Sequence, residues 1–407
     1  MTPHLLFVGG EDHDLRIPFL LTLRGRGFRV AAAGTGDPAP FVHAGLDFHP
    51  FQFKRFVNPL ADRAAIAALA RLFADIRPGL VQCFDTKPNL LVPLAARRVP
   101  GLRVVRTING LGWMYSSNAP LALALRPVFC ALHRIAARSA AVTVFQNRED
   151  QAYFTRHRME GGRPSCLIPG SGVDIERFDQ LVAAGPPPAQ LREELGFGAA
   201  EIVLTVTRLT KQKGIPTLLD AAARVHAVRP GVRFVLVGPR ESEGPFAVTE
   251  AEIAAHRPYV VATGKRTDVP SLLALADVFA FPTEYREGVP RALLEAALAG
   301  LPMVATRMPG CTDVIRDGDT GFLVPPRSPS ALADSILMML RDRAAARAMG
   351  GRATALVRRE FGLELTAVRY ARIYTELLGR DAAGAAQTPP GALRAESVPD
   401  FAFWQGS

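Results

Sequence analysis

The sequence predicts an α/β protein made of two doubly wound domains, each a mostly parallel sheet with helices on both faces. The first observation is an alternation of short apolar runs with helical segments, as in HLLFVGG, then IPFLLTLRGRG, then FRVAAAG. The second is that this alternation restarts after a proline-rich stretch at 185–190. The third is the length of 407 residues, which is long for one hydrophobic core and suits two.

Each half contains several strand candidates separated by helical segments. The first half continues with GLVQCF, LRVVRTI and AVTVFQN, and the second contains EIVLTVTRL, VRFVLVGP, YVVATG, VFAFPT, PMVAT and GFLVPP. We expect an N-terminal domain over 1–183, a linker over 184–196 and a C-terminal domain over 197–360. A last helix is expected over 361–380, followed by a disordered tail over 381–407. Ligands of such domains bind at the carboxyl ends of the strands.

The chain is strongly basic, with a net charge of +10 and a pI near 9.9, which indicates an anionic partner. Residues 1–175 hold 21 Lys and Arg against 12 Asp and Glu, so nearly all of the excess lies in the first domain. A solvated basic surface is the alternative interpretation. Because there is no cluster of basic residues interleaved with aromatic ones, we expect no nucleic acid partner.

The composition argues against several other classes. The start has no cationic leader, and no run of eighteen apolar residues is uninterrupted, so we expect neither a targeting segment nor a membrane span. Four cysteines are scattered without metal-ligand or redox spacing, which predicts reduced thiols, no disulfide and no zinc. These are Cys83, Cys130, Cys166 and Cys311.

One stretch of the second half, EYREGVPRALLEAALAGLP, places Glu287 just before a helix start and Glu295 two turns inside it. Pro290 suits the first turn of that helix. Because the helix follows a strand, its free N–H groups and positive dipole end predict a phosphate site, with Gly288 and Val289 supplying backbone N–H groups. The alternative is that Glu287 caps the helix and Glu295 is an exposed helical residue.

A second stretch, LTVTRLTKQKGIPTLLDAA, also follows a strand and carries Arg208 and Lys213. A guanidinium fork and a point charge together match the two or so negative charges of a nucleotide diphosphate. Loop charges in water are the alternative. Two such elements in one domain favour a diphosphate clamp.

At these residues the second half resembles the donor domain of glycosyltransferase family 4, retaining enzymes of the GT-B fold. The family pattern is met by Arg208 to Gly214 and by Glu287 to Thr306, and it continues through PGCTDVIRDGDTGFLVPP. The resemblance covers nearly all of residues 200–345. The first half is similar to enzymes that extend bacterial polysaccharides and lipid-linked glycans, in TKPNLLVPLAARR, INGLGWMY, VFQNREDQAYF and IPGSGVD.

The resemblance implies a fold and a set of donor contacts. Two Rossmann-like domains would face a central cleft, with the C-terminal helix crossing back to the N-terminal domain. It implies that Arg208 and Lys213 hold the donor diphosphate, that Glu287 meets the sugar hydroxyls, and that Glu295 binds the ribose. Arg208, Lys213 and Glu287 are therefore the expected catalytic residues. The remaining expected donor contacts are Gly9, Gly10, Gly264, Lys265, Arg266, Gly288, Val289 and Pro290.

The expected acceptor contacts lie in the first half and are Arg16, Lys87, Asn109 and Gly110. Many relatives have a histidine in the N-terminal domain, but this chain has Asn109 at the matching segment RTINGLG. Arg16 matches a family arginine, although the residues before it depart from the pattern. These departures leave open whether any histidine takes part in catalysis.

The chemistry expected from the resemblance needs stabilisation of the leaving group above all. Negative charge grows on the phosphate oxygen as the glycosidic bond breaks, so preplaced cations act where charge develops. We expect no metal and no other cofactor. Asp12 and Asp14 form a D-x-D motif, but a second copy at Asp317 and Asp319 indicates a chance pattern.

The function predicted is transfer of a hexose or N-acetylhexosamine from a uridine diphosphate sugar to a polyprenyl-diphosphate-linked glycan in bacterial surface polysaccharide synthesis. A sugar-nucleotide epimerase of the same fold and a non-catalytic membrane scaffold are the alternatives. A dinucleotide-dependent oxidoreductase does not fit, because FVGGEDHD breaks the G-x-G-x-x-G pattern.

The predicted location is cytoplasmic, at the anionic inner surface of the membrane. The segment SSNAPLALALRPVFCALHRIAARSA mixes apolar residues with Arg126, Arg134 and Arg138. Such a segment would attach peripherally and in a salt-sensitive way. The alternative is an ordinary buried helix of a doubly wound domain.

Overall fold

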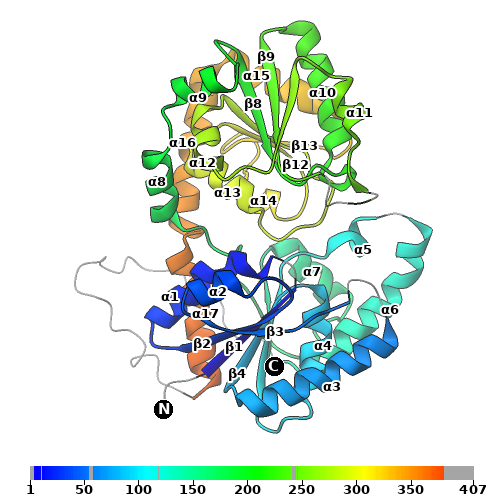
Figure 1. Ribbon diagram of the computed structural model, residues 1–407. Helices are drawn as coiled ribbons and strands as arrows, with labels where there is room; N and C mark the ends of the chain where they lie inside the picture. Colours follow the sequence, from blue (N-terminus) through cyan, green and yellow to red (C-terminus); the bar gives the residue numbers. More distant parts are fainter. Residues whose placement is uncertain are drawn as a thin grey trace. The chain divides into compact units, whose positions relative to one another are not determined.

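A computed structural model of the chain describes residues 4–10, 12–54, 58–117, 119–240, 244 and 246–379. It divides into two compact units, one with the residues up to Gly172 and those from Leu363 onward, the other with Val173–Gly362. Each unit is a parallel sheet with helices on both faces, as predicted (Figure 1). The expected tail over 381–407 lies outside the described residues.

The first unit contains a seven-stranded sheet in the order β3-β2-β1-β4-β5-β6-β7 among the described residues. Its strands are β1 (His4–Gly9), β2 (Arg29–Gly34), β3 (Asp47–Pro50), β4 (Leu80–Cys83), β5 (Arg103–Ile108), β6 (Val142–Phe145) and β7 (Ser165–Leu167). Its helices are η1 (His13–Arg16), α1 (Ile17–Gly25), α2 (Ala39–His43), α3 (Pro59–Ile76), α4 (Thr86–Ala96), α5 (Gly112–Ser116), α6 (Pro120–Ala137), α7 (Arg148–Arg156) and α17 (Leu363–Leu377).

Alternate residues of the central strand β1 enter two different cores. Leu5 and Phe7 pack with α1 and α17 on one face of the sheet, and Leu6 and Val8 pack with α3 and α4 on the other. This period of two is what a strand buried on both faces requires.

Helix α17 returns to the first unit at the end of the described chain, as the resemblance implies (Figure 1). The hydroxyl of its Tyr374 donates to Gln82 Oε1 at 3.0 Å, and the hydroxyls of Tyr370 and Thr107 are hydrogen-bonded at 3.0 Å. Both tyrosines are buried. Buried hydroxyls that each find a partner fix the helix in one register on the sheet.

The second unit contains a six-stranded sheet in the order β10-β9-β8-β11-β12-β13 among the described residues. Its strands are β8 (Glu201–Val206), β9 (Val232–Val237), β10 (Val260–Gly264), β11 (Val278–Phe281), β12 (Met303–Thr306) and β13 (Phe322–Val324). Its helices are α8 (Ile175–Ala184), α9 (Pro188–Glu194), η2 (Lys211–Lys213), α10 (Ile215–Val228), α11 (Glu250–Ala254), α12 (Val269–Leu275), α13 (Arg291–Leu298), α14 (Cys311–Val314), α15 (Pro329–Arg341) and α16 (Arg343–Glu360).

The division between the units differs from the predicted one. It falls at Gly172 rather than at 183, and α8 belongs to the second unit. The segment expected as a linker over 184–196 contains α9, which begins at Pro188, a residue suited to a first helical turn. The guanidinium of Arg192 donates to the carbonyls of Ala200 at 2.7 Å and Leu275 at 2.9 Å. The proline-rich stretch is therefore a helix start docked on the second unit.

Candidate active site

The two central strands of the second unit, β8 and β11, are neighbours that lead to opposite sides of the sheet. In doubly wound sheets, ligands bind at the carboxyl ends of such a strand pair. Lys213 follows β8 in η2, and Glu287 follows β11 in the loop before α13. The sequence-predicted residues thus lie at the point where this fold forms its binding sites.

The structure brings Lys213 and Glu287 into contact. Lys213 Nζ lies 2.7 Å from Glu287 Oε1, and the lysine side chain is only 8% exposed. The Thr283 hydroxyl donates to the same oxygen at 2.9 Å. Nζ also lies 5.5 Å from the ring centroid of Tyr285, within the range of a cation–π contact. A charged ammonium this deeply buried needs such partners.

Gly214 allows the two loops to approach. Its φ of 70° is in the left-handed region, and a Cβ there would lie 1.9 Å from the Pro282 carbonyl oxygen. The Glu284 N–H donates to the Gln212 carbonyl at 3.0 Å, which joins the β8 and β11 loops directly. Backbone contacts between the two loops therefore hold Lys213 close to Glu287.

Helix α13 begins at Arg291, one residue later than predicted, so that Pro290 is its N-cap residue rather than part of its first turn. Gly288, Val289 and Pro290 are buried in the turn before it. Glu295 is paired with Arg291 one turn earlier, with Nε and Oε1 2.8 Å apart, and its side chain is 17% exposed. Glu295 is thus neither a freely solvated helical residue nor joined to the Lys213 pair.

The other predicted donor contacts follow neighbouring strands. Arg208 is exposed after β8, and Lys265 is exposed after β10. The Gly238 N–H donates to the Gly264 carbonyl at 2.9 Å, which aligns the ends of β9 and β10. Arg266 forms two hydrogen bonds to Asp268, at 2.7 and 2.5 Å, and these bonds lower the pKa of that carboxyl group. The guanidinium of Arg266 is therefore engaged within its own loop.

The first unit gathers polar groups at its own strand ends, around Asp85 after β4. Asp85 Oδ2 accepts from the Gly10 N–H at 2.9 Å. Oδ1 accepts from Arg16 at 2.9 Å and from the Asn109 amide at 2.7 Å. We call Gly10, Arg16, Asp85 and Asn109 the Asp85 cluster. It joins the ends of β1, β4 and β5, and β1 and β4 are the neighbouring strands between which the strand order of this parallel sheet reverses.

Three other predicted residues of this unit have different surroundings. Gly9 makes room for the side chain of His13 rather than for a ligand, since a Cβ there would lie 2.2 Å from His13 Nδ1. Lys87 forms an ion pair with Asp62 of α3. Gly110 follows Asn109 with a φ of 117°. Gly9 therefore has a packing role, and Lys87 is tied to a neighbouring helix.

Asp85 is the polar residue that sequence reasoning missed. The segment VQCFDTKPN places it between a strand and a helix, where an aspartate is expected to cap the helix. Its side chain makes no capping bond to α4, and its φ of 66° and ψ of 164° are unusual for a residue with a side chain. Its position after a buried strand, beside the predicted Lys87, is the signal that could have identified it.

Within the described residues, no three or more His, Cys, Asp or Glu side chains gather in a group that could hold a metal ion. Of the two D-x-D copies, Asp12 and Asp14 are exposed. Asp317 pairs with Arg307 at 2.5 Å, and Asp319 pairs with Arg352 at 2.7 Å. The second copy thus forms ordinary surface ion pairs.

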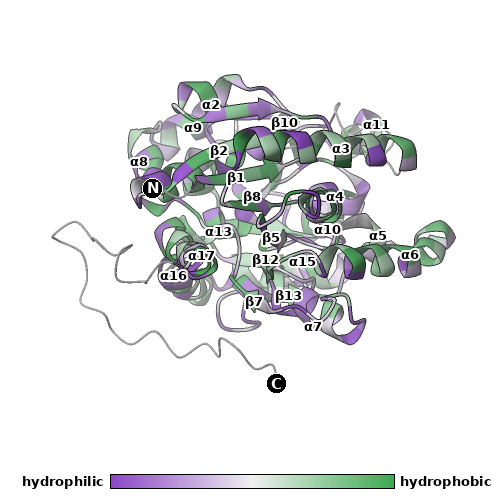
Figure 2. Cartoon of the chain, turned by 90° about the horizontal axis from the view of Figure 1, so that it is seen from below, coloured by the Kyte–Doolittle hydropathy of each residue, from purple (hydrophilic) through white to green (hydrophobic). Residues whose placement is uncertain are grey.

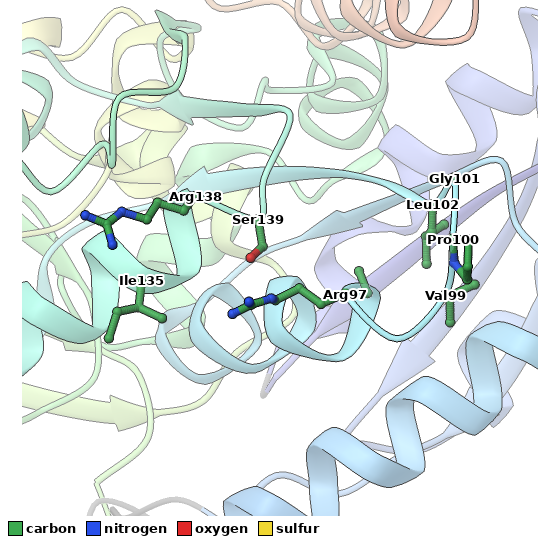
Figure 3. A pocket seen from close by; sticks show the side chains of 9 residues that line it. Arg97, Val99, Pro100, Gly101, Leu102, Ile135, Arg138 and Ser139 are labelled. Atoms are coloured by element: carbon green, nitrogen blue, oxygen red, sulfur yellow. The ribbon is translucent and has the colours of Figure 1, made fainter.

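A cavity of about 490 Å³ lies elsewhere in the first unit. Figure 3 shows Ser139 near Arg97 and Arg138 at its wall, with Ile135 below. Gly101 and Leu102 of its lining directly precede β5, so the cavity is at the amino ends of the strands. It is therefore at the opposite edge of the sheet from the Asp85 cluster.

Two parallel-sheet Rossmann-like units, one carrying a buried lysine–glutamate pair at its switch point, define an enzyme of the GT-B glycosyltransferase class. The family model described as "Glycosyl transferases group 1" matches residues 200–342, and "Glycosyl transferase 4-like domain" matches residues 20–167. The chain belongs to this family of glycosyltransferases, which confirms the resemblance seen in the sequence.

Individual relatives agree with this assignment. The chain is 30% identical over 298 residues to a GDP-mannose-dependent α-(1-6)-phosphatidylinositol monomannoside mannosyltransferase of Mycobacterium tuberculosis, covering 69% of this chain and 72% of the relative. It is 24% identical to the N,N'-diacetylbacillosaminyl-diphospho-undecaprenol α-1,3-N-acetylgalactosaminyltransferase of Campylobacter jejuni, covering 83% and 89%. The crystal structure of Anabaena HepE in complex with UDP-glucose has the same fold, with a TM-score of 0.74, 21% identity, and coverage of 92% of this chain and 99% of that one.

Proposed function

We propose that this glycosyltransferase moves a hexose or N-acetylhexosamine from a uridine diphosphate sugar to a polyprenyl-diphosphate-linked glycan, with retention of configuration and without a metal. The observation that carries the proposal is the buried Lys213–Glu287 pair at the switch point of the second unit. The Campylobacter relative is named for a diphospho-undecaprenol-linked acceptor, which supports the acceptor class.

The lysine–glutamate pair suits a donor that carries both negative charge and hydroxyl groups. Lys213 Nζ lies 2.7 Å from Glu287 Oε1, and because an ammonium has three N–H donors, a phosphate oxygen can be a further acceptor. As the bond from the sugar to the diphosphate breaks, negative charge grows on the leaving oxygen, and an ammonium already in place stabilises it without reorganisation. Arg208, exposed at the end of β8, would supply the second positive charge. Glu287 would meet the sugar.

Retention fits a mechanism in which the acceptor attacks the face from which the diphosphate leaves. In that mechanism the leaving phosphate oxygen takes the proton of the acceptor hydroxyl. The bond from the anomeric carbon to the diphosphate breaks, and the bond to the acceptor oxygen forms. No side-chain base is then required.

The experiment is a transfer assay with a panel of nucleotide sugars and a short synthetic polyprenyl-diphosphate glycan. Mass spectrometry identifies the product, and the coupling constant of the anomeric proton reports its configuration. An elongated glycan with the donor's anomeric configuration is expected. An epimerised sugar nucleotide without transfer would assign an epimerase, and no turnover of any donor would favour a scaffold.

We also propose that the first unit attaches to an anionic membrane surface through α6. Of the described part of the chain, α6 is the helix that is long and apolar enough to span a bilayer by length and composition, a property shared by core helices. Its apolar side chains are largely exposed, which differs from an ordinary buried helix. Those above a third exposed are Leu121, Leu123, Val128, Leu132 and Ile135. Figure 2 shows this helix largely in the hydrophobic colour.

Two of the arginines expected to contact lipid also donate hydrogen bonds to backbone carbonyls. Arg126 donates to the Ser117 carbonyl at 2.6 Å, and Arg134 donates to the His157 carbonyl at 2.9 Å. They close loops around α6. Arg97 and Arg138 are exposed at the cavity of Figure 3, and in this proposal they bind the anionic headgroups of the lipid.

Sedimentation with phosphatidylglycerol vesicles tests this attachment. The change Val128→Asp together with Ile135→Asp should abolish binding, because it replaces two exposed apolar side chains of the proposed lipid contact with negative charges. Arg97→Glu with Arg138→Glu should weaken binding most at low salt. Equal recovery in the supernatant with neutral and anionic vesicles would contradict the proposal.

A further inference from the structure

The carboxylate of Asp85 has room for a further hydrogen bond and is only partly buried. Its three hydrogen bonds, to Gly10, Arg16 and Asn109, occupy three of the roughly four lone-pair positions of a carboxylate. One position on Oδ2 remains among the described contacts. The Asp85 side chain is 26% exposed, so a ligand can reach it, whereas that of Arg16 is 15% exposed.

The charge of the cluster limits the kind of ligand. Burial raises the pKa of Asp85, but the Arg16 guanidinium, the Gly10 N–H and the Asn109 amide outweigh burial and hold it below the ordinary value. The ionised carboxylate therefore neutralises Arg16, and the pair carries about no net charge. Such a pair does not favour a diphosphate. An acceptor of low basicity suits a neutral O–H donor, which it orients without removing the proton.

The backbone at Asp85 indicates that this carboxylate is held in place at a cost. Its φ of 66° and ψ of 164° lie in a region that is populated essentially by glycine alone. Strain of this kind persists where surrounding contacts fix it, and it gathers at ligand sites. Here the contacts come from two other strand ends, since Gly10 follows β1 and Asn109 follows β5, whereas Asp85 itself follows β4. Arg16 is further fixed by stacking on Phe84, with Cζ 4.5 Å from the ring centroid.

A purely structural role, as a staple between strand ends, would explain the hydrogen bonds alone. That role would not explain why about a quarter of the Asp85 side chain is exposed. Nor would it explain why a strained aspartate stands where a glycine would be relaxed. We propose that Asp85 binds the terminal sugar of the acceptor, accepting a hydrogen bond from one of its hydroxyl groups while it holds Arg16 and Asn109 in place beside it. This inference rests on the proposed transfer function and names a residue and a ligand group for its acceptor site.

The test compares acceptor use in Asp85→Asn and Asp85→Gly with that of the wild type. Asparagine keeps the shape and loses the charge, and glycine relieves the backbone. Both should raise the acceptor KM at least tenfold and leave the donor KM in acceptor-free hydrolysis within twofold. The matched control is Tyr374→Phe, which removes a buried hydrogen bond of the same unit and should lower the melting temperature without changing the acceptor KM.

A set of acceptors, each lacking one hydroxyl of the terminal sugar, sharpens the test. With the wild type, one of these acceptors should have a KM ten times that of the complete acceptor. With Asp85→Asn, the same acceptor and the complete one should have equal KM values, because the substitution has already removed the hydrogen bond to that hydroxyl. Wild-type acceptor KM in both Asp85 variants would overturn the inference while leaving the transfer function intact.

If the wild type transfers no sugar, the proposed function fails separately. The affinity of the protein for the glycan, measured by NMR, then tests the inference. A tenfold loss of affinity in Asp85→Asn would support it, and equal binding, or none by the wild type, would overturn it.

Discussion

Lys213 Nζ and Glu287 Oε1 lie 2.7 Å apart although 74 positions separate them in the chain, and both side chains are largely buried. The contact exists because the loops after β8 and β11 meet at adjacent strand ends. In the absence of donor the two charges neutralise each other. A diphosphate sugar that binds here must therefore compete with Glu287 for the ammonium of Lys213. The kinetic effects of changing either residue follow from that competition.

Lys213→Ala should lower the turnover number at least tenfold, about 1.4 kcal/mol in activation free energy, because a cation is lost where charge develops. Initial rates at saturating donor and acceptor measure the effect. The matched control is Lys211→Ala, since Lys211 lies in the same short helix but is 57% exposed. Equal turnover in wild type and Lys213→Ala would remove this lysine from the catalytic set.

Glu287→Gln should lower the turnover number at least tenfold without raising the donor KM. The amide retains the shape of the carboxylate, but Lys213 loses its counter-charge and attracts the donor phosphates more strongly in the ground state. Steady-state kinetics over a range of donor concentrations separate the two parameters. A large rise in donor KM with unchanged turnover would show instead that Glu287 only binds the donor.

Glu295→Ala should mainly raise the donor KM, with turnover at saturation within about threefold of the wild type. Loss of the expected ribose contact would weaken binding of the ground state and of the transition state alike. Arg291→Ala is the matched control, because it removes the other half of the helical ion pair, worth about 0.2–0.5 kcal/mol. Should both variants show the same donor KM as the wild type, Glu295 has only a structural role.

Transfer should survive EDTA. In the proposed site, Lys213, Arg208 and the start of α13 would balance the charge of the diphosphate, so that no divalent cation would be needed. Rates are compared before and after chelation and dialysis. Complete loss of activity that manganese or magnesium restores on titration would contradict the clamp and direct attention back to Asp12 and Asp14.

Folding stability should fall as the pH drops below about 6.5. Burial and then the nearby Arg106 charge lower the pKa of His133 to about 3, and burial and Arg16 do the same for His13. Because the unfolded chain protonates these rings first, each contributes stability that is present above pH 6.5 and is lost toward pH 3, by up to about 1.4 kcal/mol per pH unit.

Urea unfolding across this pH range measures how steeply the free energy of unfolding changes with pH. In His133→Phe this slope should correspond to about one proton fewer taken up on unfolding. Above pH 7.5 the difference in unfolding free energy between the variant and the wild type should become constant. An unchanged slope in His133→Phe would show that His133 is protonated in the folded state as well.

The parallel sheets and the family could be predicted from sequence because they depend on local pattern. Lys213 and Glu287 were both identified since each follows a strand, and strand ends of one sheet converge. Their direct contact could not be predicted, because it depends on Gly214 bringing two loops within van der Waals distance.

The errors have a common physical origin in contacts between distant parts of the chain. The hydrogen bonds of Arg126 and Arg134 could not be predicted, because their partners are backbone carbonyls that carry no sequence signal. Asp85 looks like a helix cap, but its partners come from the segments after two other strands, β1 and β5. The stretch at 185–190 looks like a linker, although its last proline can also begin a helix.

The return of α17 makes the first unit discontinuous in the chain, whereas the second is one uninterrupted segment. During synthesis the second unit can therefore complete its core as soon as it is made. The first unit must wait for Tyr370 and Tyr374, which fill one face of its sheet beside Phe7 and Phe19. A ribosome stalled before residue 363 would therefore hold a nascent chain in which the first sheet still exposes the apolar surface that α17 later covers.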